Sequence, residues 1–573
     1  MHKRDFSGSD RLLLLSVFAL AIGAVSTLGA WVLLVAIRFF TNLFFFQTLS
    51  TAAHSPADNH LGAWVIAVPA VGGLIVGLMA RYGSEKIRGH GIPEALEAIL
   101  FGKSRMSAKV AVLKPLSSGI VIGSGGPFGA EGPIIMTGGA AASLLAQAFH
   151  LTSVERKSLL VAGACAGMTA VFGTPVAAVL LAVELLLFEL RPRSLLPVAL
   201  ACAVAGFLRP LWADAGALFP LSAAPGSEWA MGSCVVAGLA SGLLSVSMTY
   251  ALYAVEDAFA KLPIHWMWWP AIGGLVVGIG GYFEPRALGV GYDVIGDLLN
   301  QHLVLTAVVA LLAVKAVIWV VALGSGTSGG VLAPLLMIGA GLGCTLGHWL
   351  PGGNPGLWAL VCMAATLGGT MRAPLTAVVF AFGLTHDADA MLPVLLGSAV
   401  AYGLTVIVMP RSILTEKIAR RGHHVYREYG VDPLERHFIA EVMTHEAISI
   451  DADLPIREAQ RRYFGVDQTQ RAYPVTAEGK LLGVIDRGRL SSINPELLDQ
   501  RVGELFVAET ASYALPTETC RAVASRLAAF GLERLAVVDT PGSLRIVGIV
   551  SRSDLLRPTR QLYEDEIRRE KFF

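Results

Sequence analysis

Long apolar segments, separated by short polar or glycine-containing turns, follow one another from residue 12 to about residue 410. Several are shorter than the ~20 residues that a helix needs to cross a bilayer. We therefore predict an all-α, polytopic membrane region in which some helices are broken, with their free ends buried in protein or lining a cavity. The predicted segments are 12–46, 61–82, 108–122, 133–149, 157–171, 174–190, 194–212, 229–254, 266–283, 303–323, 331–350, 356–369, 373–385 and 391–409.

The pattern changes after Pro410, where charged residues become frequent. A basic run follows the last apolar segment, and by the positive-inside bias it predicts that this end of the membrane region faces the cytoplasm. The run consists of Arg411, Lys417, Arg420 and Arg421. We place the boundary of the membrane region near residue 425, with a linker at 426–441.

Two amphipathic units of similar layout follow the linker, at 442–499 and 500–560, before a C-terminal tail at 561–573. Each unit has a helical stretch, at 456–464 and at 519–530, then a β-rich pair and a final helical turn. A repeat of this length predicts a compact pair of α/β domains.

Composition supports the membrane assignment, because 54% of the residues are hydrophobic and only 15% are charged, whereas soluble domains carry about 25% charge. The net charge of +1 indicates no nucleic-acid partner. The first apolar segment is far longer than the ~7–15 residues of a signal-peptide core, so we predict a retained first helix.

The six cysteines contain no CxxC pair and fit packing positions rather than disulfides or metal ligands. They are Cys165, Cys202, Cys234, Cys344, Cys362 and Cys520.

One carboxylate, Glu131, stands in a glycine-rich stretch, residues 123–139, that reads Gly-Ser-Gly-Gly-Pro-Phe-Gly-Ala-Glu-Gly-Pro-Ile-Ile-Met-Thr-Gly-Gly. Pro133 is suited to a first helical turn, so a helix is predicted to begin beside Glu131. Glycines let backbone amides approach a ligand, and the helix dipole favours an anion there. Glu131 is either a helix cap or a built-in competitor for an anion, and the apolar surroundings favour the second interpretation.

A second glycine run, Gly-Ser-Gly-Thr-Ser-Gly-Gly-Val-Leu-Ala-Pro at 324–334, opens another apolar helix. Matched broken helices predict an internal repeat, near 10–225 and 229–410, with its site at the membrane midplane. A third element, Gly-His-Gly-Ile-Pro-Glu at 89–94, has the same opening. Its histidine, His90, is either an ion-facing donor or a loop residue.

Two further carboxylates follow Pro175. Glu184 lies inside an apolar run, and Glu189 lies near its polar end, close to Arg191 and Arg193 at a predicted cytoplasmic rim. Glu189 either pairs with those arginines or carries a proton. No metal-ligand cluster, nucleophile with a base, or Walker loop is present, since the 123–127 stretch lacks the Gly-Lys-Ser/Thr ending. We therefore expect a protein that is not an enzyme and holds no metal.

The three motifs at 89–93, 129–133 and 329–334 together resemble the anion-binding motifs of the CLC family of chloride channels and proton-coupled chloride transporters. The two C-terminal units resemble a pair of CBS domains. The resemblance implies a homodimer of inverted-repeat subunits in the cell inner membrane, with the CBS pair in the cytoplasm and an anion pathway in each subunit. Glu131 matches the gating glutamate of that family. The residues that match the anion-binding positions are His90, Gly91, Ile92, Pro93, Gly129, Ala130, Gly132, Gly330, Val331 and Leu332.

Several positions depart from the family pattern. His90 replaces a serine that coordinates the central anion in many members, and Leu332 replaces a phenylalanine whose amide is the coordinating group. The coordinating tyrosine of the family would fall near Pro410 or Arg411, where the chain has none. The inner proton glutamate is replaced by Leu185, as in the family's channels, although Glu189, expected one helical turn below and on the same face, is a candidate substitute together with Glu184.

CBS pairs of this type often bind an adenine nucleotide through a Ser/Thr and an Asp in the last turn. The second unit keeps Ser551 and Asp554, whereas the first has Asp486 and Arg489 at those positions. The pair therefore holds at most one ordinary nucleotide or is purely structural.

Three functions are open from the sequence. The first is chloride movement gated by Glu131, with a small inorganic anion as the substrate. The second is proton/chloride exchange with Glu189 as inner relay. The third makes the membrane region a non-conducting anchor for a CBS nucleotide sensor, and the intact trio of motifs argues against it.

Overall fold

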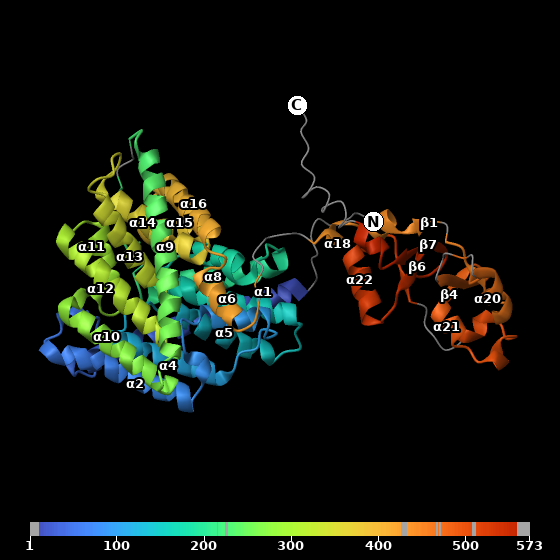
Figure 1. Cartoon of the computed structure of the whole chain (residues 1–573), viewed down its shortest axis with the longest axis horizontal. Coiled ribbons are helices and arrows are strands. Elements are labelled where there is room, and N and C mark those ends of the chain that lie inside the picture. The colour runs from blue at the N-terminus through green and yellow to red at the C-terminus, as the bar shows by residue number, and fades with distance from the viewer. Residues whose placement is uncertain are drawn as a thin grey trace. The chain divides into compact units, whose positions relative to one another are not determined.

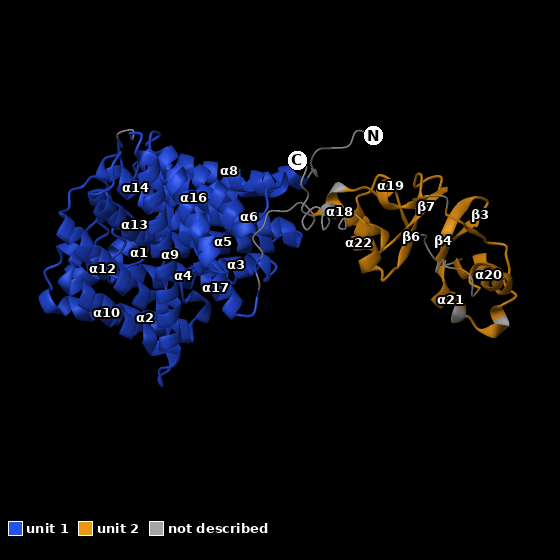
Figure 2. Ribbon diagram, turned by 45° about the horizontal axis from the view of Figure 1, so that its top comes forward, with its two compact units in different colours: residues 1–428 blue, residues 429–573 orange. Residues whose placement is uncertain are grey.

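The computed structural model describes residues 11–214, 216–223, 227–423, 425, 432–445, 447–465, 468, 472–506 and 512–557. The chain forms two compact units, residues 1–428 and 429–573 (Figure 2). The predicted tail at 561–573 and the first part of the predicted linker, 426–431, lie outside the described residues.

The first unit is built from helices that pack side by side (Figure 1). Its α-helices are α1 Arg11–Phe46, α2 Ala67–Tyr82, α3 Ile92–Leu100, α4 Ala108–Gly123, α5 Glu131–Gln147, α6 Ser153–Phe172, α7 Pro175–Leu181, α8 Pro192–Leu208, α9 Ala230–Ala260, α10 Trp269–Phe283, α11 Tyr292–Leu299, α12 Leu305–Gly324, α13 Leu332–Leu346, α14 Pro355–Met371, α15 Pro374–Thr385, α16 Met391–Val408 and α17 Ile413–Arg420.

Six helical segments among the described residues are long and apolar enough to cross a membrane. They are Arg11–Phe46, Gly62–Tyr82, Pro192–Leu211, Ala230–Ala260, Leu305–Gly324 and Met391–Arg420. Shorter apolar helices, such as Leu332–Leu346 and Pro374–Thr385, lie between them. The predicted all-α membrane region with broken helices is confirmed.

The second half of this unit repeats the first, because α9–α16 follow the same order of long and short helices as α1–α8. Helices α2 and α10 pack closely against each other at two glycines in equivalent positions. A Cβ on Gly73 would lie 2.1 Å from the carbonyl oxygen of Pro270, and a Cβ on Gly274 would lie 2.2 Å from the carbonyl oxygen of Pro69. The two halves also join in an antiparallel bridge between Gly129 and Gly330. A reciprocal contact of this kind is what a two-fold related pair of halves produces.

The segment predicted as one helix at 174–190 is different in the structure. Helix α7 passes into a π-helical stretch at Ala182–Leu187, and Phe188 then takes a left-handed conformation with φ of 54°. The expectation that Glu189 lies one helical turn below Leu185 is therefore wrong, because the helix ends before Glu189.

The second unit contains two small sheets, as predicted for a CBS pair. One sheet has the strand order β2-β3-β4 and the other has the order β1-β7-β6-β5. The strands are β1 Thr444–His445, β2 Ile450–Asp451, β3 Ala472–Ala477, β4 Lys480–Asp486, β5 Tyr513–Ala514, β6 Arg534–Val538 and β7 Ile546–Ser551. The helices are α18 Pro433–Arg436, α19 Ile439–Val442, α20 Ile456–Tyr463, α21 Arg487–Ser491 and α22 Cys520–Ala529.

The two α/β domains exchange their leading segments. Strand β1 pairs with β7, and Ile439 and Val442 of α19 pack in the core of the second domain. In return, Val502 and Phe506 pack in the core of the first. Residues 442–445, which sequence grouping assigns to the first domain, thus belong structurally to the second, because their apolar side chains are buried there.

Candidate functional site

The amino-terminal ends of α3, α5 and α13 meet in the interior of the first unit. The bridge between the halves consists of two backbone hydrogen bonds, from Gly330 N–H to Gly129 O at 3.0 Å and from Gly129 N–H to Gly330 O at 3.4 Å. Gly132 lies so close to the third motif that a Cβ on it would be 1.8 Å from the carbonyl oxygen of His90. The structure therefore brings the three glycine motifs, and with them the starts of three helices, close together; the first N–H groups of a helix have no partner within the helix and can serve a ligand.

The Glu131 carboxylate occupies the centre of this region. The side chain is fully buried, and its Oε1 accepts a hydrogen bond from the backbone N–H of Ala333 at 3.1 Å. A Cβ on Gly129 would lie 1.9 Å from Oε2, and one on Gly330 would lie 2.4 Å from it, so only glycine leaves space for the carboxylate at both positions. Oε2 has no hydrogen-bond partner among the described residues. A negatively charged group thus stands where the helix ends favour an anion.

His90 follows Gly89 in the turn that opens α3 and is only 2% exposed. Neither of its ring nitrogens has a hydrogen-bond partner within the described part of the chain. Buried polar atoms are nearly always hydrogen-bonded, so this imidazole is suited to a ligand that the protein itself does not supply. The loop interpretation of His90 fits this burial less well.

Two fully buried lysines were missed in the sequence. The ammonium of Lys114 donates to the carbonyls of Ile87 and Gly89, both at 2.8 Å, and fixes the turn before α3. Lys315 donates to the carbonyls of Ala287 and Gly289, both at 2.9 Å, in the matching turn before α11. Each lysine stands 17 positions before the first residue of the following broken helix, α5 or α13. That shared spacing inside two apolar runs is the signal that identifies them.

Glu184 is a cross-repeat helix cap. Its carboxylate accepts hydrogen bonds from the backbone N–H and the hydroxyl of Thr376, at 2.7 and 2.6 Å, and from the N–H of Leu375 at 3.3 Å, at the start of α15. Leu185 and Leu332 line a cavity of about 10 Å³ whose described lining contains no titratable side chain. Such a volume holds at most about one water molecule.

Glu189 lies outside that cavity lining. Its carboxylate accepts a hydrogen bond from the hydroxyl of Ser194 at 2.6 Å and lies 3.6 Å from the guanidinium of Arg191. The pairing of Glu189 with an arginine, expected as one alternative, is therefore present. Glu189 bonds to Ser194 and Arg191, whereas Glu131 bonds to Ala333.

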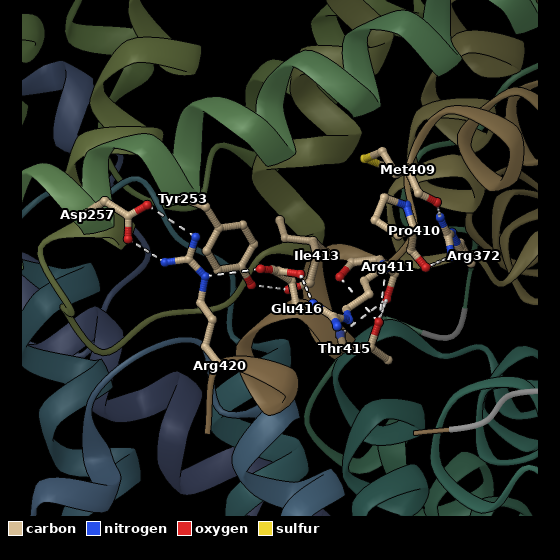
Figure 3. Close-up of polar contacts among 11 residues, drawn as sticks. Tyr253, Asp257, Arg372, Met409, Pro410, Arg411, Ile413, Thr415, Glu416 and Arg420 are labelled. Carbon is tan, nitrogen blue, oxygen red and sulfur yellow. Dashed lines mark hydrogen bonds and ion pairs between the residues drawn. The ribbon is translucent and has the colours of Figure 1, made fainter. Parts of the chain in front are cut away.

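The segment where the family's tyrosine is missing is held by other groups (Figure 3). Arg372 donates to the carbonyls of Thr405, at 2.9 Å, and Met409, at the carboxyl end of α16. The hydroxyl of Tyr253, on α9, donates to the carbonyl of Ile413 at the start of α17. These contacts stabilise the turn at 409–413 without a tyrosine in it, since cations favour the carbonyl end of a helix.

A cavity of about 730 Å³ opens beside α17, and we call it the α17 cavity. Six basic and four acidic side chains are among its lining residues. The charged residues are Lys86, Arg88, Arg105, Lys417, Arg420 and Arg421, with Glu85, Glu94, Glu97 and Glu256. The surplus of positive charge favours anions over cations in this cavity.

In the second unit, Ser551 and Asp554 bond to each other. The hydroxyl and the N–H of Ser551 donate to one carboxylate oxygen of Asp554, at 2.6 and 2.9 Å, while Arg557 lies 2.8 Å from the other. In the first domain, the corresponding Asp486 accepts the N–H of Arg489 at 2.6 Å. Both pairs close the turn after the last strand, and in the second domain the carboxylate is also balanced by an arginine.

Within the described residues, no group of three His, Cys, Asp or Glu side chains is arranged to hold a metal ion. The profile of the "Voltage gated chloride channel" family matches residues 72–406, which is more than half of the chain. The chain belongs to this CLC family. The CBS domain profile matches residues 439–493 and 507–558, and together these matches confirm the CLC membrane region and the CBS pair.

Relatives of the chain carry channel names. A ClcB-like chloride channel protein of Ralstonia nicotianae is 29% identical over 62% of this chain and 85% of its own length. The voltage-gated ClC-type chloride channel ClcB of Salmonella dublin is 29% identical over 68% of this chain and 92% of its own length.

Solved structures of the same fold carry transporter names. A slow cyanobacterial Cl⁻/H⁺ antiporter superposes with a TM-score of 0.63 at 20% identity, over 72% of this chain and 99% of that chain. A eukaryotic CLC transporter superposes with a TM-score of 0.60 at 19% identity, over 95% of this chain and 98% of that chain. These likenesses identify the CLC fold, and they leave the choice between channel and antiporter to the residues of the site.

Proposed function

We propose that this CLC protein moves chloride passively across the cell inner membrane along a pathway gated by Glu131. The observation that carries the proposal is the buried carboxylate of Glu131 at the meeting point of three helix ends, bonded to the N–H of Ala333. A carboxylate and a chloride ion compete for the same N–H groups. In the closed state Glu131 fills the anion site, and protonation or outward rotation of its side chain opens the site to the ion.

Channel-like conduction, without obligatory proton movement, agrees with the surroundings of Leu185. The small cavity that Leu185 shares with Leu332 has a mostly apolar lining whose only polar side chains among the described residues are Thr174 and Thr376, and the Thr376 hydroxyl is bonded to Glu184. Proton transfer needs titratable groups or water within hydrogen-bond reach. A relay through this cavity would find no titratable side chain in its described lining.

The alternative is a proton/chloride antiporter with Glu189 as the inner relay, assisted by Glu184. The antiporter structures that share the fold favour this alternative, and the position of Glu189 beyond the helix end weighs against it. The experiment that separates the two is reconstitution in liposomes with simultaneous recording of chloride and proton flux. Passive conduction predicts that a chloride gradient drives no uphill proton movement, and exchange predicts a fixed ratio that Glu189→Gln abolishes.

We further propose a homodimer with one pathway in each subunit. We place the CBS pair in the cytoplasm because it follows α17, whose basic residues favour the cytoplasmic side by the positive-inside bias. An adenine nucleotide is a candidate ligand of the CBS pair at Ser551 and Asp554, which would have to exchange their mutual hydrogen bonds for the ribose hydroxyls. If the reconstituted protein moved no anion, the alternative of a nucleotide sensor on a non-conducting anchor would replace the transport proposal.

A further inference from the structure

The hydroxyl of Tyr292 is an enclosed polar group that the closed structure leaves unused. Tyr292 is the first residue of α11, and its side chain as a whole is half-buried. The hydroxyl oxygen, however, is buried and has no hydrogen-bond partner among the described residues. Buried polar atoms are nearly always hydrogen-bonded, because an unpaired one has given up its bonds to water without replacement. The hydroxyl is therefore suited to a partner that arrives in another state of the protein.

The ring of Tyr292 is held by other aromatic side chains. Its centroid lies 6.0 Å from that of Phe172 and 6.2 Å from that of Phe219, and the Phe172 ring lies 5.0 Å from that of Phe380. All three phenylalanines are buried. Their rings carry no nitrogen or oxygen, so the cluster fixes the position of the tyrosine ring and supplies no conventional hydrogen bond to its hydroxyl.

Helix α13 connects the start of α11 to the Glu131 carboxylate, since α11 packs against α13 (Figure 1). The N–H of Ala333 donates to Oε1 of Glu131. Met337 follows Ala333 by four positions, so the two residues lie on one face of α13. A Cβ on Gly291 would stand 2.0 Å from Cε of Met337. Tyr292, the next residue, thus begins beside the face of α13 that binds Glu131, and Glu131 acts electrostatically on its hydroxyl.

The repeat places the start of α11 on the outer side of the membrane. Lys114 binds the carbonyls of the turn before α3, and Lys315 binds those of the turn before α11, so the two turns are equivalent. Equivalent elements of an inverted repeat face opposite sides of the membrane. Helix α3 packs against α17, whose basic residues favour the cytoplasmic side. Tyr292 therefore lies on the side toward which an outward-rotating Glu131 moves.

The charged side chains near the start of α11 already have partners. The ammonium of Lys315 lies 3.9 Å from the point where a Cβ on Gly291 would stand, and it is bonded to two carbonyls. Asp293 is exposed and accepts the hydroxyl of Ser55 at 3.2 Å. Helices α13 and α14, which pack against α11, carry no charged side chain. In contrast, Oε2 of Glu131 has no partner among the described residues and remains available to a nearby hydroxyl.

We propose that the Tyr292 hydroxyl receives the Glu131 carboxyl group when that group leaves the anion site, and so stabilises the open state of the gate. The inference rests on the proposed gating by Glu131 and deepens it, because it names the group that holds the side chain outward. A phenol can donate to a carboxylate and can accept from a protonated carboxyl, so one hydroxyl serves both forms. Tyr292 is thus a positioning residue that acts on the anion through Glu131.

The test is the pH dependence of chloride flux in liposomes for Tyr292→Phe, which removes only the hydroxyl. Loss of one neutral hydrogen bond from the open state corresponds to roughly a three- to tenfold change in the equilibrium between open and closed gate. Because each tenfold change moves the midpoint of a one-proton opening by about one pH unit, flux in Tyr292→Phe should reach half its maximum about 0.5–1 pH unit lower than in the unmodified protein. Tyr250→Phe makes the same change at an exposed position of α9 and should leave the midpoint unchanged.

A double variant separates positioning of the carboxyl group from direct contact with the ion. In Glu131→Ala protein the carboxyl group is absent, so the addition of Tyr292→Phe should change neither the size of the flux nor its independence of pH. A hydroxyl that bound chloride directly would lower the flux in this background as well. Thermal unfolding gives the structural readout. Since the hydroxyl is unpaired in the closed state, Tyr292→Phe should unfold at or above the temperature of the unmodified protein.

An unchanged midpoint in Tyr292→Phe, an equal shift in Tyr250→Phe, or an equal loss of flux with and without Glu131 would each overturn the role of Tyr292. A lower unfolding temperature of Tyr292→Phe would also contradict it, because the hydroxyl would then have a partner in the closed state. The proposed function fails in a different way. A Glu131→Ala protein that stayed pH-dependent would contradict the gate and this inference together, whereas a pH-independent Glu131→Ala protein with no midpoint shift in Tyr292→Phe would contradict this inference alone.

Discussion

Replacing Gly132 with alanine tests how closely α3 and α5 approach each other. The added Cβ would stand 1.8 Å from the carbonyl oxygen of His90, whereas unbonded heavy atoms are comfortable at about 3.5 Å. The two helix starts would have to separate by more than 1 Å. Because this contact lies where the three motifs meet, the shift would also move the N–H groups that face Glu131.

The expected cost follows from two opposing effects. Overpacking a close contact costs about 1–3 kcal/mol, and alanine in place of glycine in a helix returns roughly 0.5–1 kcal/mol. Gly132→Ala should therefore destabilise the protein by about 1–2 kcal/mol. Gly403→Ala on α16 is the matched control, because a Cβ there would meet no atom within 4 Å. It keeps the helical gain and should be neutral or stabilising.

The assay is thermal unfolding of the purified protein in detergent, followed by a thiol-reactive dye, because all six cysteines are buried in the folded chain. We expect Gly132→Ala to unfold about 1–2 °C below the unmodified protein, because the entropy of unfolding grows with chain length and makes the shift small in a large unit, and to lose chloride flux. Gly403→Ala should unfold at or above the unmodified temperature with normal flux. Unfolding of Gly132→Ala at the unmodified temperature, with full flux, would refute the reasoning.

Three further substitutions test the supporting contacts. Lys315→Met leaves the buried carbonyls of Ala287 and Gly289 without a donor, and each unpaired carbonyl costs about 1–3 kcal/mol of stability. The variant should therefore unfold at a lower temperature, whereas Lys261→Met, at an exposed position, should not. Glu184→Ala removes the cap of α15 and should cost about 1–3 kcal/mol, but Glu184→Gln should keep the measured ratio of proton to chloride flux; a changed ratio would restore Glu184 as a relay. Asp554→Asn should weaken ATP or AMP binding to the full-length protein severalfold, measured by calorimetry, while absence of binding to the unmodified chain would make the CBS pair structural.

Local patterns in the sequence predicted much of this site. Glycine followed by proline before an apolar run identified the helix starts at α5 and α13, and the matched spacing of the two runs predicted the repeat. The contacts that hold these ends together come from distant parts of the chain. Tyr253 bonds to the carbonyl of Ile413, 160 positions away, and no short-range pattern reports such a pair.

Other features lay beyond the sequence patterns for physical reasons. A π-helical stretch has the composition of an ordinary helix, so the sequence does not reveal that the helix ends before Glu189, and it wrongly predicts Glu189 one helical turn below Leu185 on the same face. The exchange of leading segments in the CBS pair depends on which core buries Val442 and Val502, and both cores consist of buried apolar side chains. A single lysine in an apolar run has no local partner, so Lys114 and Lys315 are recognised only when the two halves are compared, by their shared spacing before α5 and α13.

The central claim is that Glu131 competes with the transported anion for the same N–H groups. The most direct test records chloride flux in liposomes as a function of pH for the unmodified protein and for Glu131→Ala. Glu184→Gln serves as the control, because it removes a different buried carboxylate. The account predicts flux that rises as the pH falls in the unmodified protein and in the control, and flux that is high and independent of pH in Glu131→Ala. A Glu131→Ala protein that kept the pH dependence of the unmodified protein would contradict it.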